Sequence, residues 1–206
     1  MRSALRVPLN MSPEEAAQLR QLQALFAKAC NSLAPVVQKT KVWNRVALHH
    51  MAYKALRVQF PQMGSQMVCN AIYSVSRHSR LLFQAPNSPF NIAKLGDKGL
   101  PLLKFTDRAP VYFDRHTLSI KGGKLSMYTL DGRLRFNVGL SAEDEAKFHR
   151  MKLREVVLSR AGAERDRFEL AFVFSEKDDE DRDQPPGDQS GELPEYMLVE
   201  ENHEGN

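Results

Sequence analysis

The spacing of hydrophobic residues changes from a helical period in the first half of the chain to an alternating period in the second half. Residues 3–10, SALRVPLN, alternate weakly, which indicates one short strand. Residues 11–84 then carry three stretches with hydrophobic residues three or four positions apart, which predicts three helices. The first helix begins with Ser12 as N-cap and Pro13 at the first helical position, and Pro35 is expected to kink or end it.

The second and third helices each show one hydrophobic stripe. The second contains WNRVALHHMAYKAL at residues 43–56, and Phe60-Pro61 is expected to stop it. Its expected buried face is formed by Leu48, Met51, Ala52 and Ala55. The third helix covers residues 64–83, and its expected buried residues are Met67, Ala71, Ile72, Val75 and Leu82. Near its C-terminus the sequence places Arg77, His78 and Arg80, where cations suit the negative end of the helix dipole.

From residue 102 onward the hydrophobic residues alternate, which predicts antiparallel strands. The preceding residues 85–101 are interrupted by prolines and glycines, so we expect an irregular connection there. Three strands are predicted at residues 111–120, 124–129 and 133–138, with hairpin turns at Gly122-Gly123 and Asp131-Gly132. A short capped helix at 141–152 and two further strands, REVVLSR and RFELAFVF, complete this part of the chain.

These elements predict an α+β fold in which a small antiparallel β-barrel or sheet is interrupted by a three-helix insertion. The expected parts are a first strand at 1–10, a helical domain at 11–84, a connection at 85–101, the remainder of the β-domain at 102–176 and a tail at 177–206. The tail is rich in acidic residues, proline and glycine, so we expect it to be disordered. Its segment PEYMLVEE is the one part that can dock on another surface.

Charge is distributed unevenly along the chain. The whole sequence has 29 basic and 25 acidic residues, and residues 177–206 hold 2 and 11 of these. Residues 1–176 are left with 27 basic and 14 acidic residues, a net charge of +13. A basic body with an acidic tail favours a polyanionic partner, which the tail can mimic or screen.

Several classes of protein are disfavoured by features that the sequence lacks. No apolar stretch approaches the roughly 18–20 residues of a membrane-spanning helix, and the first residues lack the apolar region of a signal peptide. Cys30 and Cys69 form neither a disulfide framework nor a zinc quartet, so we expect buried thiols in a reducing compartment. We expect a cytoplasmic protein with no cofactor and no membrane partner.

Specific words in the chain resemble the N-terminal half of the OrfB/TnpB family, which are RNA-guided nucleases related to type V CRISPR effectors. The words are ACNSLA (29–34), KVWNRVALHHMAYKALRVQF (41–60), GSQMVCNAIYSVSR (64–77), APVYFDRHTLSIKGGKLSMYTLDGRLRF (109–136) and FELAFVF (168–174). The resemblance covers roughly residues 3–175, and it implies a location in the prokaryotic cytoplasm or nucleoid. It implies that the β-part is a wedge domain and that the helical insertion is a recognition domain.

The resemblance implies a guide RNA and a target double-stranded DNA as partners, with the protein reading a short DNA motif next to the target. The family continues into a RuvC-type nuclease domain whose first motif is G-[VI]-D-x-G. Here FELAFVF is followed by SEKDDEDRDQ, and neither that motif nor paired CxxC motifs appear. We therefore expect no catalytic residues and no cleavage by this polypeptide alone. A separately encoded RuvC-type nuclease subunit, or another transposon or CRISPR protein, is the expected partner for cutting.

Two sets of residues are candidates for contact with nucleic acid. The resemblance implies that the starts of the second and third helices read the DNA motif, and the candidates there are Trp43, Asn44, Gln62, Met63, Gln66 and Asn70. Amide side chains at the start of the third helix can bond to base edges, and a helix N-terminus favours phosphate. For RNA the candidates are Tyr112, Arg115, Lys121, Lys124, Tyr128, Arg133 and Arg135, because cations contact phosphates and aromatic rings stack on bases.

The double histidine His49-His50 is not expected to bind a metal ion. Adjacent helical residues point about 100° apart and cannot share one ion. One histidine is expected to pack against a neighbouring element or to contact nucleic acid. Two other functions stay open from the sequence: a guide-independent nucleic-acid-binding repressor or transposition accessory, and an assembly subunit that binds an acidic protein.

Overall fold

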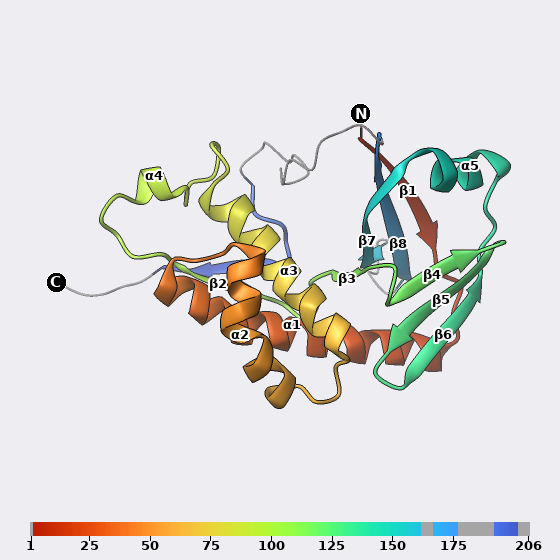
Figure 1. Ribbon diagram of the computed structural model, residues 1–206, viewed down its shortest axis with the longest axis horizontal. Helices are drawn as coiled ribbons and strands as arrows, with labels where there is room; N and C mark the ends of the chain where they lie inside the picture. The colour runs from red at the N-terminus through yellow and green to blue at the C-terminus, as the bar shows by residue number, and fades with distance from the viewer. Residues whose placement is uncertain (1, 162–166, 177–191, 202–206) are drawn as a thin grey trace. The chain divides into compact units, whose positions relative to one another are not determined.

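The computed structural model describes residues 2–161, 167–176 and 192–201 (Figure 1). The protein is a mixed α+β protein, its sheets are antiparallel, and none of those in the described residues closes into a barrel. The chain forms two compact units. Met1–Gln23 and Pro110–Arg182 make up the first, called here the sheet unit, and Ala24–Ala109 with Asp183–Asn206 make up the second, the helical unit.

The larger sheet of the sheet unit has four strands in the order β1-β8-β7-β3 (Figure 1). These strands are β1 (Arg2–Pro8), β8 (Arg167–Ser175), β7 (Lys152–Ala161) and β3 (Val111–Phe113). Alternate residues of a strand share one face, and on β8 four large hydrophobic residues of one face are almost fully buried: Phe168, Leu170, Phe172 and Phe174. Both strands predicted for this region, REVVLSR and RFELAFVF, are confirmed as β7 and β8.

The smaller sheet consists of β4 (Leu118–Lys121), β5 (Lys124–Thr129) and β6 (Gly132–Asn137) in chain order. The prediction of a single strand over 111–120 is wrong, because a turn at Asp114 divides it between the two sheets. The Asp114 carboxylate oxygen Oδ1 accepts hydrogen bonds from the backbone amides of His116 at 3.0 Å and Thr117 at 3.1 Å. Such a local side-chain bond favours a turn over an extended strand.

Two helices supply hydrophobic residues to the sheet unit. The first turn of α1 (Pro13–Thr40) begins at the expected N-cap, Ser12, and forms a capping box. In it the Glu15 amide donates to Ser12 Oγ at 3.2 Å, and Glu15 Oε2 accepts from the Ser12 amide at 3.3 Å. Helix α5 (Ala142–Arg150) begins at Ser141 and packs Phe148 edge-on against Phe172 and Phe174, with ring centroids 5.2 and 5.0 Å apart.

The helical unit contains the rest of α1 together with α2 (Arg45–Gln59), α3 (Ser65–Phe83) and the short α4 (Ile92–Leu95). Helix α1 does not end at Pro35 but continues to Thr40. Pro35 is exposed, so water can solvate the carbonyl group that loses its helical donor. The helix ends where Lys41 adopts the left-handed region with φ of 56°.

The hydrophobic stripe predicts the buried face of α3 correctly, but only part of the buried face of α2. All five residues predicted for the core of α3 are buried. On α2 the buried residues are Leu48, Ala52 and Leu56, a spacing of four. The expectation that Met51 and Ala55 are buried is wrong: Met51 is 47% exposed and Ala55 also faces solvent. His78 on α3, expected near the helix end as a cation, is completely buried.

A two-stranded sheet of β2 (Leu102–Phe105) and β9 (Met197–Glu200) also belongs to the helical unit. This corrects the expectation that residues 102–109 belong to the β-domain. The expectation of a disordered tail over 177–206 made an exception of PEYMLVEE as a segment that can dock. Residues 192–201 are ordered and include β9, so PEYMLVEE does dock, whereas residues 177–191 and 202–206 lie outside the described part of the chain. Among the described residues, no helix is long and apolar enough to cross a membrane.

Candidate nucleic-acid interface

The three-stranded sheet β4-β5-β6 has one buried and one exposed face. Leu118, Leu125, Met127 and Phe136 are buried, and their spacing places them together on one side of the sheet. The other face therefore carries the intervening residues. Strand pairing arranges these in cross-strand rows: Lys121, Lys124 and Asn137 in the first, Ser119, Ser126 and Arg135 in the second, and Tyr128 and Arg133 in the third.

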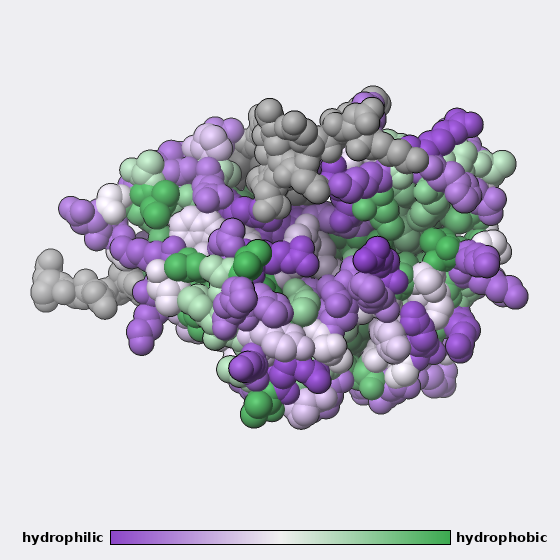
Figure 2. All heavy atoms as spheres, viewed as in Figure 1, coloured by the Kyte–Doolittle hydropathy of each residue, from purple (hydrophilic) through white to green (hydrophobic). Residues whose placement is uncertain are grey.

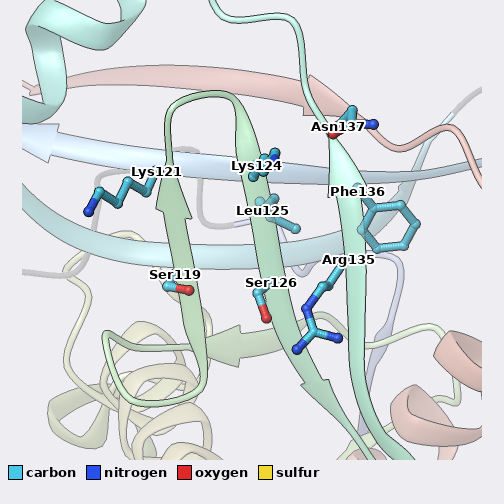
Figure 3. A pocket seen from close by; sticks show the side chains of 8 residues that line it. All are labelled: Ser119, Lys121, Lys124, Leu125, Ser126, Arg135, Phe136 and Asn137. Carbon is cyan, nitrogen blue, oxygen red and sulfur yellow. The ribbon is translucent and has the colours of Figure 1, made fainter.

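This exposed face is hollowed. A concavity of about 530 Å³ lies on it, lined by Ser119, Lys121, Lys124, Leu125, Ser126, Arg135, Phe136 and Asn137 (Figure 3). In the close view the lysines lie near the β4–β5 turn, and Arg135 extends beside Ser126 on the neighbouring strand. Hydrophilic side chains gather over these three strands in the space-filling view (Figure 2). The lining therefore combines three cations and two hydroxyl groups with the apolar residues Leu125 and Phe136. The cations suit an anionic ligand.

The cations of this face lack acidic partners within the described residues. None of Lys121, Lys124, Arg133 and Arg135 forms an ion pair there. Lys121 and Lys124 are also direct register partners, and like charges placed opposite each other on a sheet are destabilising. A bound anion would relieve this repulsion.

Tyr128 and Arg133 form the aromatic end of the same face. The Arg133 guanidinium lies over the Tyr128 ring with its Cζ atom 4.2 Å from the ring centroid, and its Nε donates to Ser126 Oγ at 3.0 Å. Tyr128 is 44% exposed, so part of the ring is available to a ligand. Two contacts fix the arginine in advance, and a fixed guanidinium loses little freedom when it binds phosphate or stacks on a base.

The two remaining RNA candidates have different positions. Arg115 is exposed in the turn between β3 and β4, where its Nε lies 3.4 Å from His116 Nε2. Tyr112 is 4% exposed, because all three residues of β3 are buried. Its ring cannot stack on an RNA base in this structure. Tyr112 is therefore removed from the candidate surface as a correction.

The six candidates for DNA-motif recognition all lie in the helical unit, but two of them are inaccessible. Met63 is 1% exposed, and its carbonyl oxygen accepts from Arg57 Nη1 at 2.6 Å. Asn70 is 5% exposed, with its Nδ2 3.8 Å from Met67 Sδ. Both residues serve the packing of the helical unit. The prediction that they face DNA does not agree with their burial.

The other four candidates reach the surface to different degrees. Asn44 is exposed, but its Oδ1 accepts from the Val46 and Ala47 amides as the N-cap of α2, which leaves its Nδ2 as the available donor. Trp43 is half-buried, with its ring centroid 5.4 Å from that of Phe83. The remaining two flank the start of α3: Gln62 is exposed and Gln66 is half-buried.

The double histidine lies on α2 with its two rings directed differently. The His49 ring stacks on Tyr53 with centroids 4.6 Å apart, and the His49 and His50 ring planes meet at 89°. His50 is exposed and His49 is half-buried. Their ring centroids are 6.1 Å apart, and no group of three or more His, Cys, Asp or Glu residues that could hold a metal ion is found among the described residues. One imidazole thus takes part in packing, and the other lies at the surface.

The RNA-binding candidates were chosen from the sequence for their charge or aromatic ring, and this choice missed three residues on the exposed face of β4-β5-β6. Ser119, Ser126 and Asn137 are not charged or aromatic, yet they line the concavity between the cations. Strand alternation could have found them, because positions 119 and 121, then 124, 126 and 128, then 133, 135 and 137 share one face. Arg45 was also missed; its Cζ lies 5.2 Å from the centroid of the Tyr73 ring. No protein-family model and no curated protein matches this chain.

Proposed function

We propose that this protein is a RuvC-less or split subunit of an RNA-guided DNA-binding system. It holds the scaffold of a guide RNA on the exposed face of β4-β5-β6 and contributes to reading a short DNA motif through the helical unit. Any cleavage is supplied by a separately encoded RuvC-type nuclease. The observation that carries the RNA-binding part is the row of Lys121 and Lys124 facing each other beside Arg135, without an acidic partner among the described residues.

Nucleic acid accounts for this face better than an acidic protein does. Neighbouring cross-strand rows are two residues apart along each β-strand, a distance of about 6.6–6.8 Å. This distance is close to the spacing of successive phosphates along a nucleic-acid strand. The row with Tyr128 adds an aromatic ring, which an acidic peptide does not require but an unpaired base uses for stacking. Hydroxyls of Ser119 and Ser126 provide neutral donors between the cations.

The guide and the DNA motif enter the proposal through the resemblance of residues 3–175 to the OrfB/TnpB family. In the helical unit, the accessible amides that support motif reading are Asn44, Gln62 and Gln66. Sequence specificity would come mostly from guide pairing, while the protein reads only the flanking motif.

Purification from the native host tests the proposal. The protein is isolated gently, and the RNA and protein that accompany it are sequenced and identified. One discrete, structured RNA is the expected result, and a RuvC-type nuclease beside it would support the split-subunit form. A preparation free of RNA would contradict the guide-bound function. A stable complex with an acidic protein instead would favour an assembly subunit.

A further inference from the structure

Acidic side chains are absent from a long part of the helical unit. Residues 24–96 contain nine Lys or Arg residues and no Asp or Glu. The C-terminal segment, defined here as residues 192–201, contains four Glu residues and no Lys or Arg. Both stretches belong to the same compact unit. An acidic segment therefore shares a compact unit with a long stretch, residues 24–96, that has no negative charge of its own.

The backbone of β2 offers an open edge to this segment. On one side, the Asn31 side chain pairs with Phe105: Asn31 Nδ2 donates to the Phe105 carbonyl at 2.8 Å, and the Phe105 amide donates to Asn31 Oδ1 at 2.7 Å. On the other side β9 pairs antiparallel with β2, and the Thr106 amide donates to the Tyr196 carbonyl at 2.9 Å. Without the segment, that second edge would be left unpaired.

Two side chains anchor the segment. Met197 is 3% exposed, and Tyr196 reaches the buried His78, with its hydroxyl 2.8 Å from His78 Nε2. His78 Nδ1 lies 2.7 Å from the Ser74 carbonyl oxygen, so Nδ1 carries the proton and donates. Nε2 is then the acceptor of the Tyr196 hydroxyl. The docking is specific, because it needs a hydroxyl donor at this position.

The carboxylates of the segment remain at the surface of the helical unit. Glu192, Glu195, Glu200 and Glu201 are all exposed. Glu200 forms an ion pair with Lys104 across the two strands, with its Oε1 2.5 Å from Lys104 Nζ. Strand pairing holds Glu200 beside β2 and keeps its chain neighbours Glu195 and Glu201 close to it. Negative charges held there lower the local concentration of any approaching polyanion.

We propose that the docked C-terminal segment is a built-in competitor of polyanion binding by the helical unit. A tethered competitor acts at a high effective concentration without being consumed. A nucleic acid must therefore bind against the field of the four carboxylates or displace β9 from β2. The proposal rests on the part of the proposed function in which the helical unit meets nucleic acid, and it is independent of RNA binding by β4-β5-β6.

The first test removes the charges and keeps the strand. In the full chain, Glu192, Glu195, Glu200 and Glu201 are replaced together by Gln, and binding of a fluorescein-labelled 20-nucleotide oligothymidine is measured over a range of salt concentrations. The expected result is a Kd several-fold lower than that of the wild type at low salt, with the difference disappearing at high salt.

A matched control changes the net charge equally at exposed positions of the sheet unit: Glu14→Gln, Asp131→Asn, Glu143→Gln and Glu145→Gln. The expected change in Kd for this variant is less than twofold. An equal gain in both variants would mean that only the net charge matters, and this would overturn the proposal. If neither the wild type nor the four-Gln variant binds the oligonucleotide, the proposal is also wrong.

The second test undocks the strand and keeps its charges. Tyr196→Phe removes the hydroxyl that bonds to His78, and Met197→Ser removes the buried anchor. Hydrogen exchange at the Thr106 amide should accelerate in both, and the Kd should fall as the carboxylates leave their fixed place. Faster exchange with an unchanged Kd would overturn the proposal. Replacing Lys121 and Lys124 probes the RNA face alone, so failure there leaves this result intact.

Discussion

At the scale of single residues, burial decides which polar side chains can take part in recognition. Asn70 and Tyr112 have the chemistry of nucleic-acid contacts, and both lie inside the protein. Gln66 sits at the boundary, half-buried in the first turn of α3. A side chain partly held by the protein loses less freedom when it bonds to a base edge than a fully exposed one does.

We expect Gln66→Ala to change the preference for the DNA motif while RNA binding is retained. Removing a bond to a base edge costs about 1–3 kcal/mol of discrimination. The measurement is selection from a randomised flanking sequence, with the RNA affinity determined in parallel. Gln84→Ala is the control, since Gln84 is exposed at the other end of α3. An identical motif profile in wild type and Gln66→Ala would place motif reading elsewhere.

His78 makes the stability of the helical unit depend on pH. Burial lowers the pKa of His78 to about 3, with the neighbouring Arg77 charge acting in the same direction. In the unfolded chain the pKa of this imidazole is near 6.5. Between pH 6.5 and 3, His78 is therefore protonated in the unfolded chain but stays neutral in the folded one. The contribution of neutral His78 to the free energy of unfolding is complete above pH 6.5 and is lost as the pH falls towards 3.

The expected slope below pH 6.5 is at most about 1.4 kcal/mol of unfolding free energy per pH unit from this one group. Urea denaturation between pH 7.5 and 5 measures it. His78→Gln should lower stability at neutral pH and reduce the slope, because Gln does not titrate. His50→Gln, at an exposed position of α2, should leave the slope as it is. Parallel pH profiles for wild type and His78→Gln would contradict this account.

At the scale of elements, local sequence signals predicted α3, β5, β7 and β8 well because their periodicity and turn residues agree. The elements that were missed depend on distant parts of the chain. β2 becomes a strand by pairing with β9, and Leu102 lies opposite Glu200 in that pair. Neither four-residue strand has enough alternation of its own to be identified as a strand. The prediction of one strand over 111–120 was wrong for a local reason, because the Asp114 carboxylate accepts hydrogen bonds from the amides that follow it and forms a turn.

The β4–β5 hairpin depends on two glycines with positive φ, and the two are not equivalent. Gly122 has φ of 57° and Gly123 has φ of 72°. A Cβ at Gly123 would lie 3.0 Å from the Val138 carbonyl oxygen, whereas a Cβ at Gly122 would meet no neighbouring heavy atom within 4 Å among the described residues. Both positions carry the left-handed penalty of roughly 1–2 kcal/mol for a residue with a side chain.

We therefore expect Gly123→Ala to lower the free energy of unfolding more than Gly122→Ala does, because it adds a close backbone approach to the same strain. Urea midpoints of the two variants provide the comparison. Gly123→Ala should also weaken RNA binding, since the turn positions Lys121 and Lys124. Equal urea midpoints for the two variants would show that the Val138 carbonyl oxygen moves away from the new Cβ without lowering stability.

At the scale of the whole molecule, the sequence indicated a basic protein, but it did not show which charges lie together on one surface. The fold determines that arrangement. The cations on β4-β5-β6 are brought onto one face by strand register, which composition does not reveal. The division into units was also hidden, because β2 and β9 pair across nearly a hundred residues of sequence within the helical unit. Pairings of that sequence separation have no local signature.

RNA binding by the whole molecule should depend on salt in proportion to the number of phosphates that the protein neutralises. Replacing Lys121 and Lys124 by Ala should weaken binding and reduce the slope of log K against log salt by roughly one for each phosphate that is no longer neutralised. Arg150 and Lys152 are exposed in the same unit but lie outside β4-β5-β6, so their double Ala variant is the control. An unchanged slope in the Lys121 and Lys124 variant would move the RNA face elsewhere.

The pairing of β1 with β8 has a consequence for how the protein is made. β1 is complete at Pro8, and its strand partner β8 begins at Arg167. At ~5–20 residues per second, a ribosome needs on the order of 8–30 s to synthesise the residues between them. Throughout that interval β1 exposes an unpaired edge, and any chain released before β8 keeps it. Slow or interrupted translation should therefore yield aggregates from a protein whose finished form hides that edge.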